Sequence, residues 1–200
     1  MFITFEGGEG AGKTTLIEKI LQDLLARKLP ALKTRAPGGT KTGEMIRNLL
    51  LQKGESPLSK RCELLLFLAD RAQHVDEVIE PALKENKIVL CDRFNDSTIA
   101  YQGGARGFDE ALVKNLCAFA SLNLIPDLTF YLDLDPKIGL QRVKRSKDRI
   151  EAEDIAFHEN IRQAFHRLAK TEPKRFRILD ASRSPDQVFQ EAMRHINELL

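Results

Sequence analysis

The sequence predicts an α/β fold in which a five-stranded parallel sheet carries helices on both faces. Two observations lead to this fold class: short apolar runs alternate with amphipathic helical patterns, and the chain has 200 residues. Strands that alternate with helices form βαβ units, because parallel neighbours need a helical crossover between them. The length suits one compact domain and is too short for two domains with a linker. We therefore expect a single domain over residues 1–200, with ligands bound beyond the carboxyl ends of its strands.

Each element of this fold has its own sequence pattern. Apolar runs typical of strands, three of them ending in Asp, occupy Phe2–Glu6, Ala31–Arg35, Lys87–Asp92, Leu128–Asp133 and Phe176–Asp180. Apolar residues at helical spacing predict helices at Lys13–Arg27, Ser59–Leu83, Glu110–Leu122, Asp154–Lys170 and Pro185–Leu200. Pro136 fits the first position of a further helix that continues towards Arg142.

Composition limits the class of protein. Lys and Arg number 31 against 29 Asp and Glu, and a net charge of +2 argues against a dedicated nucleic-acid binder. The longest apolar stretch, residues 64–69, is too short for a membrane helix, and Glu6 comes too early for a signal peptide. Cys62, Cys91 and Cys117 are widely spaced, so neither a disulfide framework nor a zinc site is predicted. We expect a cytoplasmic protein without a membrane or nucleic-acid partner.

A glycine-rich loop follows the first strand. Residues 7–14 read Gly7-Gly8-Glu9-Gly10-Ala11-Gly12-Lys13-Thr14, which fits GxxxxGK[ST] with a strand before it and a helix after it. Glycines let backbone N–H groups surround a phosphate, and the start of the helix adds the positive end of its dipole. We expect this loop and Thr15 to bind the phosphates of a nucleotide, with Lys13 at the β- and γ-phosphates and Thr14 on Mg²⁺.

Other nucleotide-binding patterns fit less well. The dinucleotide pattern GxGxxG fails, because its last glycine would fall on Lys13. A GTPase is disfavoured, because Asn86-Lys87 precedes a strand where the guanine motif NKxD should follow one. The sequence therefore points to a phosphate loop of a nucleotide-dependent enzyme or switch.

The third predicted strand ends in Cys91-Asp92-Arg93. At that edge Asp92 lies across from Thr14, where it can orient Mg²⁺ or a metal-bound water. Arg93 can direct a bidentate guanidinium at a second phosphate. The alternative is a strand-end salt bridge with a purely structural role.

A basic segment follows the fourth strand and the short helix after it. Five of the eight residues 142–149 are Lys or Arg. A lid at about 142–151 that closes over phosphates would neutralise charge on the transferred group and exclude water. A solvated basic loop or a nonspecific nucleic-acid patch is the alternative, and the phosphate loop upstream favours the lid.

Taken together, these residues resemble the bacterial thymidylate kinases (dTMP kinases) of the P-loop nucleoside-monophosphate kinase group. The resemblance covers most of the chain in the family's order, at FEGGEGAGKTT (5–15), TRAPGGTKTGEMIRNLLL (34–51), LLLFLADRAQHVDEVIEPAL (64–83), VLCDRFNDSTIAYQGGARG (89–107), PDLTFYLDLDP (126–136) and DRIEAED (148–154). It implies a three-layer α/β/α fold, a homodimer, and transfer of the γ-phosphoryl group of ATP to dTMP on the route to dTTP.

The resemblance also implies an acceptor site. Phe67 and Arg71 share one helix face at i, i+4 spacing, where the family stacks an aromatic ring on thymine and donates a hydrogen bond to a thymine carbonyl. Ordinary core packing is the alternative for Phe67. Tyr101 falls where the family has an aromatic ring that crowds the 2′ carbon of the sugar and so excludes a ribose hydroxyl. Further family positions on the acceptor side are Arg35, Pro37, Arg93, Ser97, Thr98 and Gln102, and Glu9 falls where the family places a carboxylate near the acceptor sugar or magnesium.

The family keeps its catalytic arginine either in the phosphate loop or in the lid. Gly10 occupies the loop position here, so the resemblance implies the lid type, with Arg145 and Arg149 as candidates and Arg142 against adenine. Three features depart from the family: Ala36 stands where the motif has Glu, Phe94 where it has Tyr or His, and the lid is about two residues shorter.

Catalysis of this kind needs no general base, because the acceptor phosphate is already ionised; it depends on positioning and charge stabilisation. Three other functions stay open from sequence: a kinase for another monophosphate or for a nucleoside, a nucleotide-binding switch without turnover, and a nucleic-acid binder. Phe67, Arg71 and Tyr101 argue against the switch, and the small net charge argues against the last.

Overall fold

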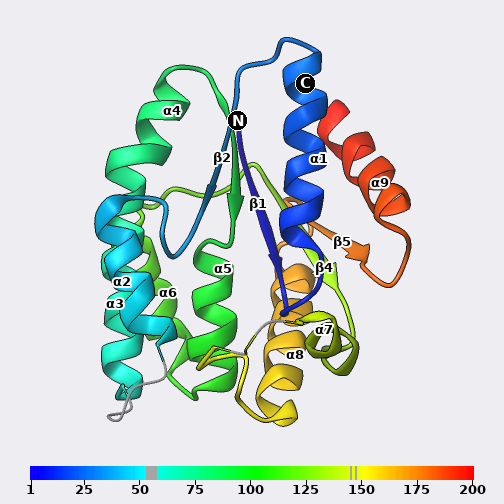
Figure 1. The fold of residues 1–200 in the computed structure, drawn as a ribbon. Helices are drawn as coiled ribbons and strands as arrows, with labels where there is room; N and C mark the ends of the chain where they lie inside the picture. Colours follow the sequence, from blue (N-terminus) through cyan, green and yellow to red (C-terminus); the bar gives the residue numbers. More distant parts are fainter. Residues whose placement is uncertain (53–57, 145, 147) are drawn as a thin grey trace.

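The predicted strands form one parallel sheet in the computed structural model, with the order β2-β3-β1-β4-β5 (Figure 1). The structure describes residues 1–52, 58–144, 146 and 148–200. The strands are β1 (Phe2–Gly7), β2 (Ala31–Arg35), β3 (Ile88–Asp92), β4 (Leu128–Asp133) and β5 (Phe176–Asp180). Phe5 pairs with Asp92, and Asp92 pairs with Arg35, so the carboxyl ends of β1, β2 and β3 lie level at one edge.

Helices cover both faces of this sheet, which confirms the predicted three-layer architecture. Helices α1 and α9 lie together on one face, and α3, α4, α5, α6 and α8 lie on the other (Figure 1). The helical segments are α1 (Lys13–Ala26), α2 (Lys41–Leu51), α3 (Lys60–His74), the π-helical η1 (Val75–Ile79), α4 (Glu80–Lys84), α5 (Asn95–Thr98), the π-helical η2 (Ile99–Ala105), α6 (Glu110–Ala120), α7 (Pro136–Arg142), α8 (Ile155–Thr171) and α9 (Pro185–Asn197).

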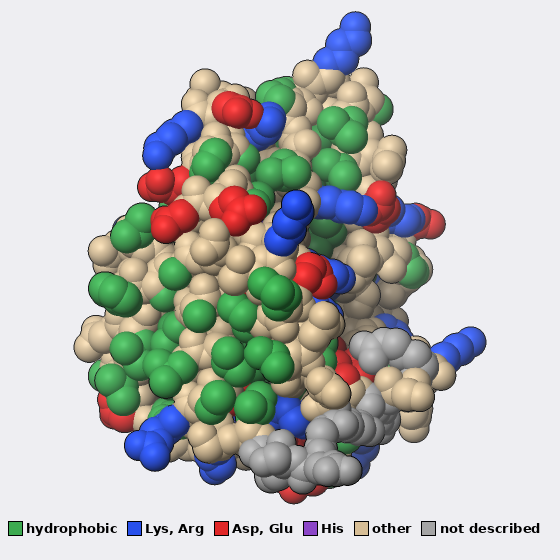
Figure 2. Space-filling view, turned by 60° about the vertical axis from the view of Figure 1, so that its left-hand side comes forward, with side chains coloured by type: hydrophobic (Ala, Val, Ile, Leu, Met, Phe, Trp, Pro, Cys, Tyr) green, Lys and Arg blue, Asp and Glu red, His purple; other side chains and the backbone are tan. Residues whose placement is uncertain are grey.

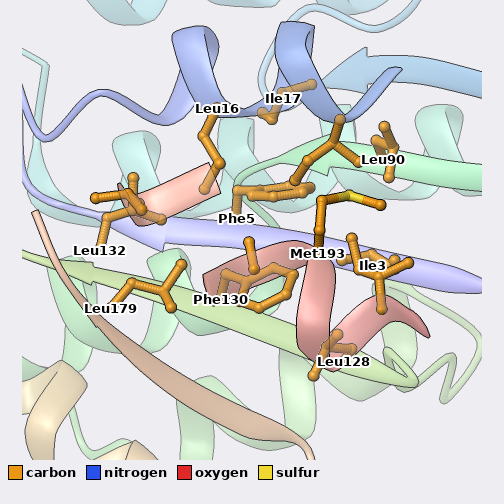
Figure 3. Close-up of a cluster of buried hydrophobic side chains, with 14 of the residues drawn as sticks. Ile3, Phe5, Leu16, Ile17, Leu90, Leu128, Phe130, Leu132, Leu179 and Met193 are labelled. Carbon is orange, nitrogen blue, oxygen red and sulfur yellow. The ribbon is translucent and has the colours of Figure 1, made fainter. Parts of the chain in front are cut away.

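The alternation of side chains along β1 divides the core between the two faces. Ile3 and Phe5 point towards α1 and α9, where they meet Leu16 and Met193 (Figure 3). The alternate residues of β1 point to the other face of the sheet, and Glu6, which is one of them, extends towards α5. Burial of apolar side chains on both faces holds the sheet in place between the helices. This fixes the position of its carboxyl edge, where polar side chains gather.

The structure differs from the sequence-based helices in two regions. The continuous helix expected at Ser59–Leu83 leaves α-helical geometry at Val75 and passes through η1 before α4. Pro81, which has no N–H to donate, lies just past that wide turn. Two further helical regions, α2 and the α5–η2 segment, were not predicted. In the part of the chain that the structure describes, no helix is long and apolar enough to cross a membrane.

Candidate active site

Two adjoining cavities open at the carboxyl ends of β1, β2 and β3. The larger, of about 870 Å³, is lined by residues 9–15 of the phosphate loop and by Asp92 and Arg142. The smaller, of about 90 Å³, is lined by side chains of α3 and of the α5–η2 segment. Both cavities share the lining residues Glu9, Ala36, Arg47, Arg93 and Glu151. Ligands in the two cavities would therefore meet at this shared wall.

The phosphate loop has the backbone shape that its sequence predicts. Gly10 and Gly12 have φ values of 68° and 90°, in the left-handed region that favours glycine. A Cβ at Gly10 would lie 2.1 Å from the carbonyl oxygen of Gly139, so the loop also packs too closely for a side chain there. Lys13 begins α1, and its Nζ donates to the carbonyl oxygens of Gly7 at 3.2 Å and Gly8 at 2.9 Å. Burial and the nearby Arg93 lower the pKa of Lys13.

Thr14 and Asp92 face each other across the sheet edge, as predicted. The Thr14 hydroxyl donates to Asp92 Oδ2 at 3.3 Å. The other carboxylate oxygen, Oδ1, is buried and has no hydrogen-bond partner among the described residues. A hydroxyl beside a carboxylate oxygen with spare capacity suits Mg²⁺, which is commonly held by one or two protein oxygens together with substrate phosphates. Among the described residues no group of three His, Cys, Asp or Glu could bind a metal alone, so phosphates would have to complete such a site.

Arg93 lies on the shared wall with its donors fixed in three directions. Its Nη1 donates to Gly7 O at 2.9 Å and to Ser97 Oγ at 3.2 Å, and its Nη2 donates to Glu9 Oε1 at 2.6 Å. The guanidinium also lies over the ring of Tyr101, 5.2 Å from the centroid. The backbone of Arg93 is left-handed, with a φ of 69°, which is uncommon for a residue with a side chain. Residues in such a conformation cluster at active sites and ligand-binding sites, where the surrounding contacts hold them in place.

Glu9 is the anionic partner of this arginine. Its Oε1 also accepts a hydrogen bond from the Tyr101 hydroxyl at 2.9 Å. Burial opposes ionisation of Glu9, but the charges of Arg93 and Lys13 outweigh it and lower the pKa of Glu9 to about 2. The shared wall therefore carries a fixed negative charge between two cations at neutral pH.

The smaller cavity collects the side chains expected on the acceptor side. Phe67 and Arg71 reach it from α3, and it is also lined by Pro37, Ser97, Thr98, Tyr101 and Gln102. Arg71 is 3% exposed, and its guanidinium lies 4.3 Å from the ring centroid of Phe94. Its Nε and Nη1 are buried without a hydrogen-bond partner among the described residues. Buried donors are rarely left unpaired in proteins, so Arg71 has spare hydrogen-bonding capacity beside this cavity.

Three other sequence-predicted side chains lie outside the smaller cavity, and of these Arg142 is on the side of the phosphate loop, where it was expected. Arg35 lines the larger cavity and pairs with Glu44 at 2.7 Å, and the smaller cavity does not include it. Arg142 lines the larger cavity and donates to Ala181 O at 3.3 Å. Arg149 reaches neither cavity, because its Nη1 pairs with Glu63 on α3 at 2.5 Å. Arg145 lies outside the described residues.

Arg47 was not singled out from the sequence although it lines both cavities. It lies on α2, and its Nη1 donates to Pro37 O at 2.9 Å. Burial and the nearby charge of Arg35 lower the pKa of Arg47, which shows how densely cations gather here. A lone cation beside the apolar run of α2 could have suggested this residue, had the helix been predicted.

Comparison with known proteins agrees with this geometry. A family model described as thymidylate kinase matches residues 5–192, which include every residue lining the two cavities. A thymidylate kinase of Protochlamydia amoebophila is 47% identical over 98% of this chain and 92% of its own length. One from Carboxydothermus hydrogenoformans is 48% identical over 95% and 93%. The crystal structure of thymidylate kinase from Ehrlichia chaffeensis has a TM-score of 0.82 at 35% identity and matches over 98% of each chain.

Proposed function

Because the chain belongs to the thymidylate kinase family, we propose that its larger cavity binds ATP, that its smaller cavity binds dTMP, and that the γ-phosphoryl group passes between them to give dTDP. One observation carries the acceptor assignment. The buried Arg71, which has two unpaired donors, lines a cavity that Phe67 also lines, and this cavity meets the phosphate loop at Glu9 and Arg93. A planar base with carbonyl oxygens, carried on a phosphate, fits those groups.

The proposed reaction is a direct displacement at phosphorus. A phosphate oxygen of dTMP attacks the γ-phosphorus, and the bond from that phosphorus to the β-phosphate oxygen breaks, so ADP leaves. No side chain needs to remove a proton, because a phosphate monoester is largely ionised near neutral pH. Lys13 is placed to contact the β- and γ-phosphates, and Arg93 to hold the phosphate of dTMP at the shared wall. Mg²⁺, held by Thr14 and Asp92, would neutralise charge on the triphosphate.

Side chains around the acceptor set its identity in this proposal. Tyr101 donates its hydroxyl to Glu9 and is thereby held over the place assigned to the sugar. Its ring would leave no room for a 2′-hydroxyl. Thr98 and Gln102 would contact the base edge, Ser97 the region of the phosphate, and Pro37 the thymine methyl group.

We propose one kinase domain over residues 1–200, with the basic segment at about 142–151 as its lid. Arg142 is proposed to pack on adenine, and Arg145 and Arg149 to stabilise the transferred phosphoryl group. Arg149 is held by Glu63 in this structure, so a catalytic contact requires that its guanidinium leave that carboxylate.

A substrate panel tests the proposal. ADP release from ATP and Mg²⁺ is measured with dTMP, its ribose analogue, dUMP and thymidine side by side. We expect turnover with dTMP, weaker turnover with dUMP, and little with the ribose analogue or thymidine. Phosphorylation of thymidine without phosphorylation of dTMP would overturn the acceptor assignment.

The homodimer is likewise a proposal, supported by one face of the molecule. Figure 2 shows hydrophobic side chains gathered on the side where α2, α3 and α6 lie in Figure 1. Large apolar side chains are exposed on these three adjacent helices and on the turn after α6, at Met45, Leu49, Leu65, Phe119, Leu122 and Ile125. Exposed apolar side chains gathered on one face are typical of a surface that contacts another protein. Light scattering should give twice the chain mass, and Phe119→Asp should lower it. We also propose that the protein works in the cytoplasm.

A further inference from the structure

Glu6 is a buried carboxylate that the proposed reaction does not use. It is the penultimate residue of β1 and is fully shielded from solvent. Its side chain points away from α1 and towards α5. There Oε1 accepts a hydrogen bond from the backbone N–H of Phe94 at 2.7 Å, and Oε2 accepts one from Ser97 Oγ at 2.5 Å.

Both of these contacts lead to Arg93. Phe94 follows Arg93 directly, so the bond to its N–H holds one side of the left-handed Arg93 backbone. The other side is held by the Arg93 N–H, which donates to Phe5 O at 3.0 Å. Ser97 gives its only hydroxyl proton to Glu6, which leaves the hydroxyl oxygen free to accept from Arg93 Nη1 at 3.2 Å. The carboxylate thus fixes both the backbone and the side chain of this arginine.

We infer that Glu6 is a positioning residue for phosphoryl transfer, which holds the guanidinium of Arg93 on the wall shared by the two cavities. This inference rests on the proposed function, because it gives Glu6 a role through an arginine placed between ATP and dTMP. Glu6 itself lines neither of the two cavities.

Electrostatics separate this role from a merely structural one. Burial, together with the nearby charge of Asp96, raises the pKa of Glu6 to about 7, although Ser97, Arg93 and the Phe94 N–H act in the opposite direction. Holding Glu6 ionised therefore opposes folding above neutral pH. A neutral side chain of the same shape should leave the fold at least as stable while it disturbs Arg93.

Glu6→Gln is that side chain. Its amide oxygen can accept from the Phe94 N–H, but its NH₂ group then faces Ser97 Oγ as a second donor and competes with Arg93. At pH 8 we expect the melting temperature to match or exceed that of the wild type. We expect kcat/KM for dTMP to fall about tenfold or more, the size of one lost charge-assisted hydrogen bond.

A double-mutant cycle with Arg93→Ala gives the decisive comparison. If Glu6 acts through Arg93, Glu6→Gln should change kcat/KM by less than about twofold in the Arg93→Ala background. Equal losses in both backgrounds, or an unchanged kcat/KM in the single variant, would overturn the inference. Asp133→Asn, which removes a strand-end carboxylate bonded to Tyr131 and Arg162, is the matched control and should keep wild-type kcat/KM.

A second variant keeps the inference testable if the Glu6→Gln protein does not fold. Glu6→Asp keeps the negative charge but shortens the side chain by one methylene group, so it cannot reach both the Phe94 N–H and Ser97 Oγ. It should lose activity in the Arg93 background and change kcat/KM by less than about twofold in Arg93→Ala. The same loss in both backgrounds would contradict the inference. If wild-type protein forms no ADP in response to dTMP, the proposed function fails instead, so the two failures are distinguishable.

Discussion

Replacement of Arg71 by Met should separate acceptor recognition from stability. Arg71 is 3% exposed, and two nitrogens of its guanidinium have no hydrogen-bond partner in the described part of the chain. A hydrogen bond from a charged donor contributes about 1.5–3 kcal/mol. Loss of one such bond to the base therefore predicts a fall in kcat/KM for dTMP of roughly 10- to 150-fold, at about 1.4 kcal/mol per factor of ten.

The stability of the protein without dTMP should not fall in the same variant. Burial of a charged guanidinium that has two nitrogens without hydrogen-bond partners costs several kcal/mol, while its contact with the Phe94 ring returns about 2 kcal/mol. Arg71→Met should therefore melt no lower than the wild type, yet show a smaller rise in melting temperature on addition of dTMP.

Initial rates at varied dTMP and calorimetric melting, with and without dTMP, measure both effects. Arg61→Met, on an exposed position of the same helix, is the matched control and should behave as the wild type. A kcat/KM for dTMP within twofold of the wild type would refute the role given to Arg71.

Four further changes have definite expected outcomes. Lys13→Ala should cost at least about 2–3 kcal/mol of transition-state stabilisation, and near-normal turnover in steady-state assays would contradict its contact with the triphosphate. Tyr101→Ala should narrow the preference for dTMP over its ribose analogue by about tenfold, and an unchanged ratio of the two kcat/KM values would exclude the steric role. Asp92→Asn should raise the Mg²⁺ concentration needed for half-maximal rate, seen by metal titration, unless Asp92 is only structural. Burial lowers the pKa of His74 to about 3, so only the unfolded chain binds a proton at this residue as the pH falls below about 6.5. This should cost the folded protein about 2 kcal/mol of stability at pH 5. His74→Gln should therefore flatten the fall in melting temperature between about pH 7 and pH 5.

The sheet could be predicted from sequence because each strand has a strong local pattern. Every predicted strand is present, and none begins or ends more than one residue from its predicted position. Helix α2 was missed because Met45 and Leu49 are exposed, which obscures the apolar face made by Ile46 and Leu50. The α5–η2 segment was missed for the opposite reason: it is buried although it is rich in polar residues and glycine, and only tertiary contacts explain that.

The site was predictable where a motif fixes its own geometry. The phosphate loop and the Thr14–Asp92 pair follow from strand ends that must lie at one edge of a parallel sheet. The roles of Arg47 and Glu6 could not be predicted in this way. Arg47 depends on how α2 packs, and Glu6 depends on which face of β1 meets α5, and neither leaves a local signal.

The shared wall has a consequence for inhibitor design. Since Glu9 and Arg93 line both cavities, the two proposed binding places are direct neighbours. One molecule that joins two nucleosides through a phosphate chain could occupy both at once, without the entropy cost of bringing in a second ligand. By the same reasoning, a resistance mutation at either residue would also impair the enzyme's use of both natural substrates.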